Sequence, residues 1–501
     1  MGIFFLGATS VSLSGQAAAP ATLTLQEAIE LARRNNPDFL QQSNDVGVAN
    51  WAVRDAYGAL LPSASAGVSY SYSAAGNQRI GNIPGSDLGL ETSTDYYSSS
   101  ASLSLSYRLS AQQLLAPGQQ KANRRATVAG IDAASFNLEA NVVRQYLAVL
   151  RAQENVTLAE QELESAKTNQ MLAEAKVATG SAIPLESKQA AVQVGRVEVQ
   201  LLQAQNAVAN EKLRLMQLLG VQFNEQFQLT STFTVSDVPG SLATFTNAAL
   251  SGHPTLRAAR ANEEASVSSY KMAKSAYLPS LSLSTGLSGF MRQASNADFL
   301  IAQEAAGAQS SLTQCELLRN ISNGLSTPLP NAPTSCSLDM FLPTPERMQE
   351  IRDQNSVFPF KYQGEPLGVS MSISLPIFDG FSRERQLQTS RVAVTDAELR
   401  VRAEELRIRT EVGAAYANAT TGRRSVELEA RNRDLAAEQL ELARERYRFG
   451  AGTFLELNDA QTVKARADQA YLNALYNYHE ALAALESAVG RPLAQVTGEN
   501  R

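Results

Sequence analysis

The feature that most constrains this 501-residue chain is an internal duplication. In each half a turn containing a proline, at Pro37 or Pro254, is followed by a second proline 25 residues later (37 to 62 and 254 to 279). Further along, Gly180 and Gly450 are each followed by another glycine after 40 residues (180 to 220 and 450 to 490). Chance does not produce matched intervals in the same order, so the sequence contains two copies of one structural unit.

Each half is predicted to consist of helix, strand, loop, strand, long helix, tight turn and returning helix. The long helices are expected within Gly118–Thr179 and Phe381–Arg448. Roughly 60 residues at about 1.5 Å each would span about 90 Å. A second helix returns after each glycine turn, which predicts two antiparallel hairpins with small-residue tips. A helical bundle or a coiled-coil spacer would explain the hairpins equally well, but it would not explain the strands.

Four short segments alternate between apolar residues and serine or glycine, which predicts strands with two unlike faces. Each has about ten residues, the length of a membrane-spanning β-strand, and aromatic residues gather near the strand ends. The alternative is a soluble sandwich with one solvated face. The segments are Ser63–Ser73, Ala101–Leu109, Leu281–Phe290 and Val369–Leu375; in the second, Leu103, Leu105 and Leu109 form the apolar side and Ser102, Ser104 and Ser106 the polar side.

Four strands are too few for a membrane barrel, because the smallest single-chain barrels have about eight and open edges are not tolerated in lipid. Membrane insertion would therefore require several copies of the chain to share one barrel. Two copies would supply about 8 strands and three about 12. No run of about 18 apolar residues is present, so a transmembrane helix is excluded on length.

Composition and motifs argue against catalysis, a metal site or a cofactor. The net charge is −6 with both signs interspersed, so no basic surface for nucleic acid is predicted. His479 begins a zinc-protease-like pattern, but the residue four positions on is Ala483, so no second ligand exists. His253 occupies the position of Asn36 in the first half and is expected to be structural.

Two segments lie outside the simple repeat. Residues 1–22 contain a short apolar run and a small-residue stretch, which predicts a signal remnant, with a disordered tail as the alternative. The offset between the halves grows from 217 (62 to 279) to 268 (102 to 370), so about 51 extra residues lie within 293–366. We expect this Pro-, Asn- and Ser-rich segment to be a structureless surface loop that is either functional or disordered.

Tandem halves in this order, with "SLPIFDGF" closing a strand and "RYRFGAGTFLELNDAQ" at a helical tip, resemble the TolC-type outer-membrane efflux protein family. The resemblance runs from about Leu23 to Leu493. It implies a mainly α fold with membrane β: a trimeric 12-strand outer-membrane β-barrel, continued by a 12-helix periplasmic α-barrel with a small mixed α/β equatorial belt. The expected divisions are 23–220 (first repeat), 221–245 (equatorial linker), 246–490 (second repeat, with an extracellular loop at 293–366) and 491–501 (C-terminal tail).

The implied function is that of a passive exit duct in a tripartite efflux or type I secretion system. Such a duct lies in the Gram-negative outer membrane and extends into the periplasm. The implied partners are two further copies in a homotrimer, a periplasmic adaptor (membrane fusion) protein, an inner-membrane pump of the RND, ABC or MFS type and outer-membrane lipid, but no nucleic acid. The alternative is a periplasmic coiled-coil scaffold or adaptor with a small β-domain.

The resemblance also assigns residues at the periplasmic entrance. Glu456 and Asp459 match an acidic ring, although acids in a first helical turn also simply favour the helix dipole. Tyr447 and Glu186 match a latch that holds the entrance closed. The family's latch arginine is Gly452 here, which leaves Arg446 or Arg448 as replacements, and the expected adaptor contacts are Gly180, Ser181, Leu185, Gly450, Ala451, Gly452 and Leu455.

In the implied topology both strand-to-strand loops face the cell exterior, and the larger one holds Cys315 and Cys336 in an oxidising compartment. A disulfide between them would close about 22 residues and stabilise the chain by roughly 3 kcal/mol. Two free thiols are the alternative.

Overall fold

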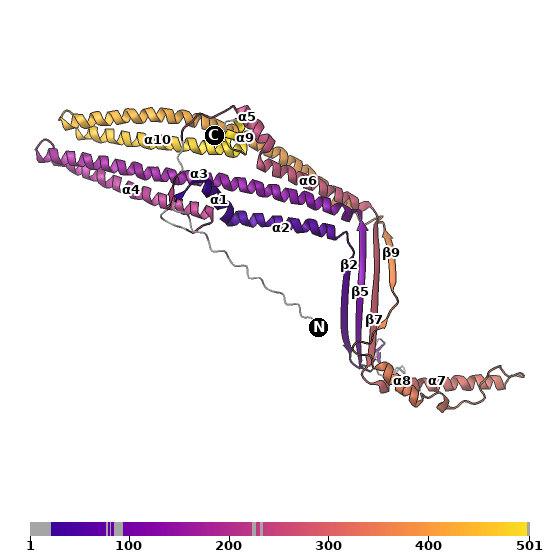
Figure 1. Cartoon of the computed structure of the whole chain (residues 1–501). Coiled ribbons are helices and arrows are strands. Elements are labelled where there is room, and N and C mark those ends of the chain that lie inside the picture. The colour runs from indigo at the N-terminus through magenta and orange to yellow at the C-terminus, as the bar shows by residue number, and fades with distance from the viewer. Residues whose placement is uncertain are drawn as a thin grey trace. The chain divides into compact units, whose positions relative to one another are not determined.

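The computed structural model describes residues 22–76, 79–80, 82–84, 94–222, 227–230 and 234–497. The described chain forms two compact units (Figure 1). The first, here the helical unit, contains the residues up to Ala56, Leu115–Lys274 and the residues from Gly380 onward. The second, the strand unit, contains Tyr57–Leu114 and Ser275–Asp379. Each unit therefore takes segments from both halves of the sequence.

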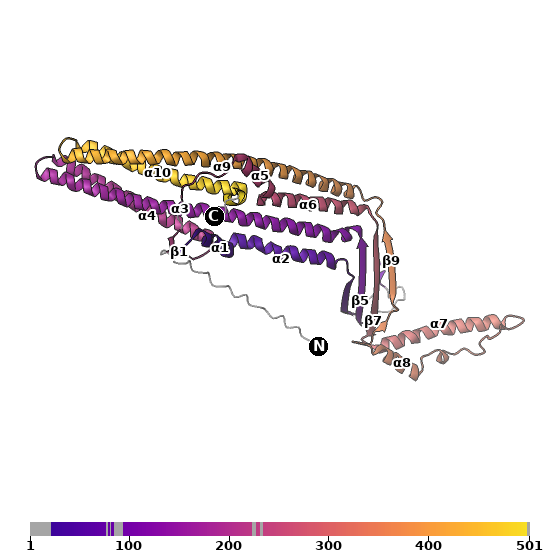
Figure 2. The same ribbon diagram turned by 45° about the horizontal axis from the view of Figure 1, so that its top comes forward.

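The helical unit is built from two long hairpins and the shorter helices that accompany them (Figure 2). α3 has 68 residues and α9 has 67, and each is followed by a helix of 36 residues. Among the described helices, none contains a stretch long and apolar enough to cross a bilayer. The parallel strands β1 (Thr22–Leu23) and β6 (Gln228–Leu229) pair within this unit. The helices are α1 (Leu25–Asn35), α2 (Pro37–Gly58), α3 (Ala111–Ala178), α4 (Pro184–Leu219), α5 (Leu242–Gly252), α6 (Pro254–Lys274), α9 (Ser382–Arg448), α10 (Phe454–Val489) and α11 (Leu493–Thr497).

Two hydrophobic cores lie where the returning helices end. In the first, α1 packs on α3 and on the end of α4, and the Tyr146 hydroxyl donates a hydrogen bond to the Leu23 carbonyl at 2.9 Å. In the second, α5 packs on α9 and on the end of α10, and Phe245 and Ile408 are fully buried there. Burial of such side chains stabilises each region by roughly 1.5–3 kcal/mol per residue.

A single polar side chain fixes the equivalent turn in each core. The Asn36 amide donates to the Leu218 carbonyl at 2.8 Å, and its oxygen accepts from the Phe39 N–H. His253 takes the same place in the second half, with Nε2 3.1 Å from the Ser487 carbonyl and Nδ1 facing the Thr255 N–H. Burial lowers the pKa of His253. The structural role expected for His253 agrees with these contacts.

The strand unit contains a sheet in which β2 (Ser63–Ser73), β5 (Tyr96–Ser110), β7 (Ser280–Ala294) and β9 (Gly368–Ser374) pair antiparallel in that order. These strands lie where the alternation predicted them, but β5 and β7 are longer, with 15 residues each. The short β8 (Gln363–Gly364) also pairs with β7, and β3 (Arg79–Ile80) pairs with β4 (Ile83–Pro84).

The register separates the sheet into an apolar face and a serine face, because residues opposite each other in a ladder point to the same side. Leu105 lies opposite Ala64 and Thr285, and Leu103 lies opposite Ala66 and Leu287. The other side is joined by hydroxyl–hydroxyl bonds between neighbouring strands: Ser63–Ser106 and Ser65–Ser104 at 2.7 Å, Ser69–Ser100 at 2.8 Å and Ser284–Ser370 at 2.6 Å.

The extra segment of the second half is ordered, so the expectation of a structureless loop at 293–366 is wrong. It contains α7 (Ala297–Asn323), the 3-10 turn η3 (Leu338–Met340) and α8 (Pro345–Asn355). Another 3-10 turn, η2 (Ser275–Tyr277), lies outside this segment and precedes β7. Arg347 pairs with Glu304 at 2.8 Å and Arg352 with Asp298 at 3.2 Å, which holds α8 on α7. Cys315 and Cys336 form a disulfide with Cα atoms 5.9 Å apart.

Gly220 should be the least replaceable glycine of the first hairpin. Gly180 and Gly220 both have left-handed backbones, with φ of +73° and +68°. A Cβ at Gly180 would meet open space, whereas a Cβ at Gly220 would lie 2.2 Å from the Asn35 carbonyl oxygen. Gly180→Ala should cost roughly 1–2 kcal/mol, because a Cβ in the left-handed region crowds the following carbonyl oxygen. Gly220→Ala should cost more and lower the midpoint of thermal unfolding further, measured by circular dichroism in detergent. Equal midpoints for the two variants would contradict this account.

Candidate functional site

The tips of the two hairpins have the same turn geometry. Gly180 and Gly450 adopt left-handed φ values of +73° and +78°, which glycine tolerates without a steric penalty. In the first tip the Lys176 carbonyl accepts from the N–H groups of residues 181 and 182, and in the second the Arg446 carbonyl accepts from those of residues 451 and 452. The tips are therefore equivalent in backbone, and any difference between them lies in their side chains.

A buried tyrosine close to the second turn connects the two hairpins. Tyr447 of α9 is only 2% exposed, and its hydroxyl donates a 2.7 Å hydrogen bond to Oε2 of Glu186 on α4. Its ring meets Phe454 edge-on at 5.8 Å and packs in a small core with Ala173 and Leu457. The structure thus brings together Tyr447 and Glu186, the residues that the sequence predicted as the latch.

Lys176 supplies the cation of this contact and was missed in the sequence analysis. Its ammonium group donates to the Tyr447 carbonyl and lies 4.2 Å from the centroid of the Tyr447 ring. A cation over an aromatic face contributes about 0.5–2 kcal/mol, depending on desolvation. Lys176 is four residues before Gly180, as Arg446 is before Gly450, so the repeat could have pointed to it.

The two arginines proposed as replacements for the missing latch arginine bind elsewhere. Arg446 lies 3.6 Å from the Glu456 carboxylate and donates to the Ala451 carbonyl, so it stays within its own hairpin. Arg448 pairs with Glu445 at 3.2 Å. Among the described contacts neither arginine reaches Glu186, and the cation that contacts Tyr447 is Lys176.

The predicted ring residues lie in the first turns of α10. The Thr453 hydroxyl caps this helix by accepting from the Glu456 N–H. Glu456 and Asp459 are both exposed and stand one turn apart, so they share one side of the helix. The geometry is thus compatible both with a favourable helix dipole and with two carboxylates facing a common space.

Burial raises the pKa of Tyr447, and its hydrogen bond to Glu186 adds to the effect. The tyrosine hydroxyl therefore remains a donor at neutral pH. A raised pKa means that this contact stabilises the folded chain fully below the ordinary tyrosine value of about 10, and that the contribution is lost only as the pH rises through the folded-state value.

A second polar contact between the hairpins lies further from the tips than Tyr447. Asn169 of α3 and Gln461 of α10 are both buried and hydrogen-bonded to each other. Arg444 of α9 approaches Asn169 at 3.4 Å and donates to Ser165 at 3.1 Å. Sequence reasoning missed this network because its members show no pattern within any single helix.

The ends of the tips carry exposed apolar side chains. Leu455 is 76% exposed, and the other exposed members of this group are Ile183, Leu185 and Phe449. Two of them, Leu185 and Leu455, are among the expected adaptor contacts. Exposed apolar side chains and a glycine turn are thus present at both tips.

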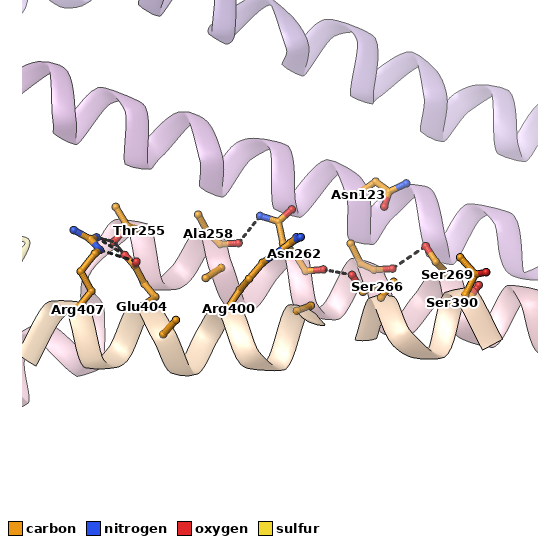
Figure 3. A pocket seen from close by; sticks show the side chains of 16 residues that line it. Asn123, Thr255, Ala258, Asn262, Ser266, Ser269, Ser390, Arg400, Glu404 and Arg407 are labelled. Atoms are coloured by element: carbon orange, nitrogen blue, oxygen red, sulfur yellow. Dashed lines mark hydrogen bonds and ion pairs between the residues drawn. The ribbon is translucent and has the colours of Figure 1, made fainter. Parts of the chain in front are cut away.

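A groove of about 960 Å³ lies between α6 and α9, with Asn123 of α3 at its edge (Figure 3). Thr255, Glu404 and Arg407 lie together at one end, and Ser269 and Ser390 lie at the other. Arg407 holds both Glu404 and Glu411 through hydrogen-bonded ion pairs, which keeps the pKa of the Glu404 carboxyl below its usual range. The charges of Glu404 and Arg407 in the groove are thus used in a structural pair.

Within the described ranges no group of three or more His, Cys, Asp and Glu side chains could hold a metal ion.

Comparison with known proteins decides the family. The model of the outer membrane efflux protein family matches residues 28–221 and 352–491. The chain belongs to this family. No curated protein matches the sequence.

Solved structures share the fold of this outer membrane efflux protein. CusC, described with the changes that accompany its folding and transmembrane channel formation, matches with a TM-score of 0.68, 18% identity and coverage of 93% of this chain and 92% of that chain. The CmeC outer membrane channel of Campylobacter jejuni gives 0.68 and 18%, covering 93% and 85%. The open state of the Neisseria gonorrhoeae MtrE outer membrane channel gives 0.65 and 18%, covering 94% and 89%.

Family membership confirms the predicted efflux function and the predicted location in the outer membrane. It also decides against the alternative of a periplasmic scaffold or adaptor. The family is one of transport channels and not of enzymes.

Proposed function

We propose that this outer membrane efflux protein acts as a homotrimer, in which three chains share one 12-strand barrel and one 12-helix tunnel. The observation that carries the proposal is the open sheet. Among the described residues β2 pairs only with β5, and β9 only with β7, so each chain ends in two unpaired strand edges. Unpaired backbone groups are not tolerated in lipid, so the edges must meet other chains.

The strand directions support closure by identical copies. Three successive antiparallel pairings make β2 and β9 antiparallel to each other. The β9 edge of one copy can therefore continue the antiparallel order on the β2 edge of the next. The apolar face would then meet lipid and the serine face would line a wet exit, as in membrane barrels that alternate along each strand.

The hairpins would form the tunnel across the periplasm. A helix of 68 residues, the length of α3, extends for roughly 100 Å at about 1.5 Å per residue. Substrates would pass through this tunnel passively after an inner-membrane pump of the RND, ABC or MFS type delivers them. The same duct would serve a tripartite efflux pump or a type I secretion system.

The hairpin tips would form the entrance. Tyr447, Glu186 and Lys176 would hold the two hairpins of each chain together in the closed state, and Glu456 and Asp459 would form an acidic ring. The apolar tip surface around Leu185 and Leu455 would contact the periplasmic adaptor. The disulfide between Cys315 and Cys336 would lie on the cell exterior, where it resists reduction.

The trimer is the first testable consequence. Native mass spectrometry of the detergent-extracted protein should give a mass about three times that of one chain, because three copies supply the 12 strands of the barrel. The same sample should form stable conducting pores in a planar bilayer. A monomeric mass from a sample that still conducts would contradict the shared barrel.

Breaking the latch should open the entrance. Tyr447→Phe with Glu186→Gln removes a charge-assisted hydrogen bond that contributes about 1.5–3 kcal/mol, so the closed state loses population. Single-channel conductance in planar bilayers should rise. Tyr471→Phe with Glu160→Gln makes the same chemical changes away from this contact and should leave conductance unaltered. Equal conductance of the latch variant and the natural protein would refute the latch.

Neutralising the ring should weaken cation selectivity. Glu456→Gln with Asp459→Asn keeps the side-chain shapes and removes about six charges from the trimer's entrance, where a narrow lumen concentrates cations. The reversal potential across a potassium chloride gradient should move toward zero. Glu316→Gln with Asp339→Asn removes as many charges from the α7–α8 segment and serves as the control. A shift of equal size in the control would locate selectivity outside the ring.

A further inference from the structure

The segment Val357–Tyr362, which connects α8 to β8, lies across one end of the apolar face. Phe358 packs against Tyr97 and Tyr70, with ring centroids 5.6 and 6.3 Å apart. The register places Tyr70 and Tyr97 on the side of the sheet that carries Leu103 and Leu105. Phe358 therefore covers the apolar side of the sheet and not the serine side.

Tyr362 gives a second, independent contact with the same side. Its hydroxyl lies 2.8 Å from Ser99 Oγ, and Ser99 lies opposite Tyr70 in the ladder. A Cβ at Gly289, which pairs with Ala101 on this face, would lie 3.0 Å from the Tyr362 Cβ. Glycine at 289 thus lets the connecting segment approach the sheet closely.

The backbone of the segment is fastened to the sheet as well. The Gln293 side-chain oxygen accepts from the N–H groups of Val357 and Phe358 at 3.0 and 2.8 Å. Gln293 lies opposite Tyr97, again on the apolar face. Ser99 and Met291 beneath the segment are each only 2% exposed, so the contact is packed and excludes water.

The side of Val357–Tyr362 that faces away from the sheet is apolar, and no other part of the described chain covers it. Phe360 is 72% exposed, and Lys361 beside it is exposed too. Tyr72 lies on the nearby part of β2, and its hydroxyl donates a 2.7 Å hydrogen bond to Asp95. This aromatic ring therefore has one polar end. Aromatic rings with a polar end, accompanied by lysine, are typical of the boundary between acyl chains and headgroups.

We infer that Val357–Tyr362 is a lipid-docking surface on the outer wall of the barrel. Phe358 and Phe360 would enter the acyl–headgroup boundary, and Lys361 would meet a lipid phosphate. The inference rests on the proposed function, in which the apolar face meets lipid. Lipid is the expected occupant because the segment continues the face that Leu103 and Leu287 form. The α7–α8 pair is then tied to the outside of the wall and does not cover the exit.

Depth-dependent fluorescence quenching tests this assignment in the full-length protein. Trp51 is the only tryptophan, so Trp51→Phe gives a silent background. Phe360→Trp is the reporter, and Leu367→Trp, a further exposed apolar position, is a second reporter. Leu103→Trp on the apolar face and Ser102→Trp on the serine face are the controls. The vesicles contain phosphatidylethanolamine and phosphatidylglycerol with bromine on the acyl chains, near the headgroup or near the chain end.

Phe360→Trp should lose most fluorescence with bromine near the headgroup and less with bromine near the chain end. Leu103→Trp should be quenched by brominated lipid, and Ser102→Trp only by aqueous iodide. If Leu103→Trp is quenched by lipid but Phe360→Trp responds to iodide alone or to neither quencher, the docking surface is refuted and the proposed barrel stands. If Leu103→Trp itself escapes lipid quenching, the proposed function fails with it.

Discussion

The two sheet edges at β2 and β9, which have no partner strand among the described residues, are the constraint on which the rest of the protein depends. Backbone N–H and C=O groups that face lipid must have partners. Within the part of the chain that the structure describes, β2 and β9 pair with another strand on one side only. In the proposed homotrimer, pairing of β2 with β9 of a neighbouring copy would meet this requirement without a longer chain.

The two halves keep a common backbone but use different side chains at equivalent places. Asn36 and His253 both bind the carbonyl end of a returning helix, one through an amide and one through an imidazole. At the tips, Lys176 reaches across to Tyr447, whereas the equivalent Arg446 turns to Glu456 in its own hairpin. The two tips thus share their turn geometry, and single side chains decide that one contact joins the hairpins whereas the other stays within one of them.

Sequence reasoning succeeded where a local period carries the information. Alternation of serine with apolar residues located β2 at Ser63–Ser73, and the glycine spacing located both hairpin tips. It failed where contacts join distant segments. Lys176 and Tyr447 are 271 residues apart, and nothing in the local pattern of either links them. The helices α7 and α8 were missed because their Pro-, Asn- and Ser-rich surroundings are typical of loops, while ion pairs and a disulfide, invisible to periodicity, order them.

Gly452 lies between the residues of the proposed latch and those of the proposed acidic ring. The family's arginine is absent at this position, and a Cβ there would lie 3.0 Å from the Glu456 carboxylate and 3.1 Å from the Arg446 Cβ. Glycine therefore makes room for Arg446 to reach Glu456. Both side chains are exposed, so the pair contributes at most about 1 kcal/mol and exchanges readily with water and salt. Part of the charge of Glu456 is then already balanced within the hairpin, which leaves Asp459 as the stronger attractor of cations at the proposed entrance.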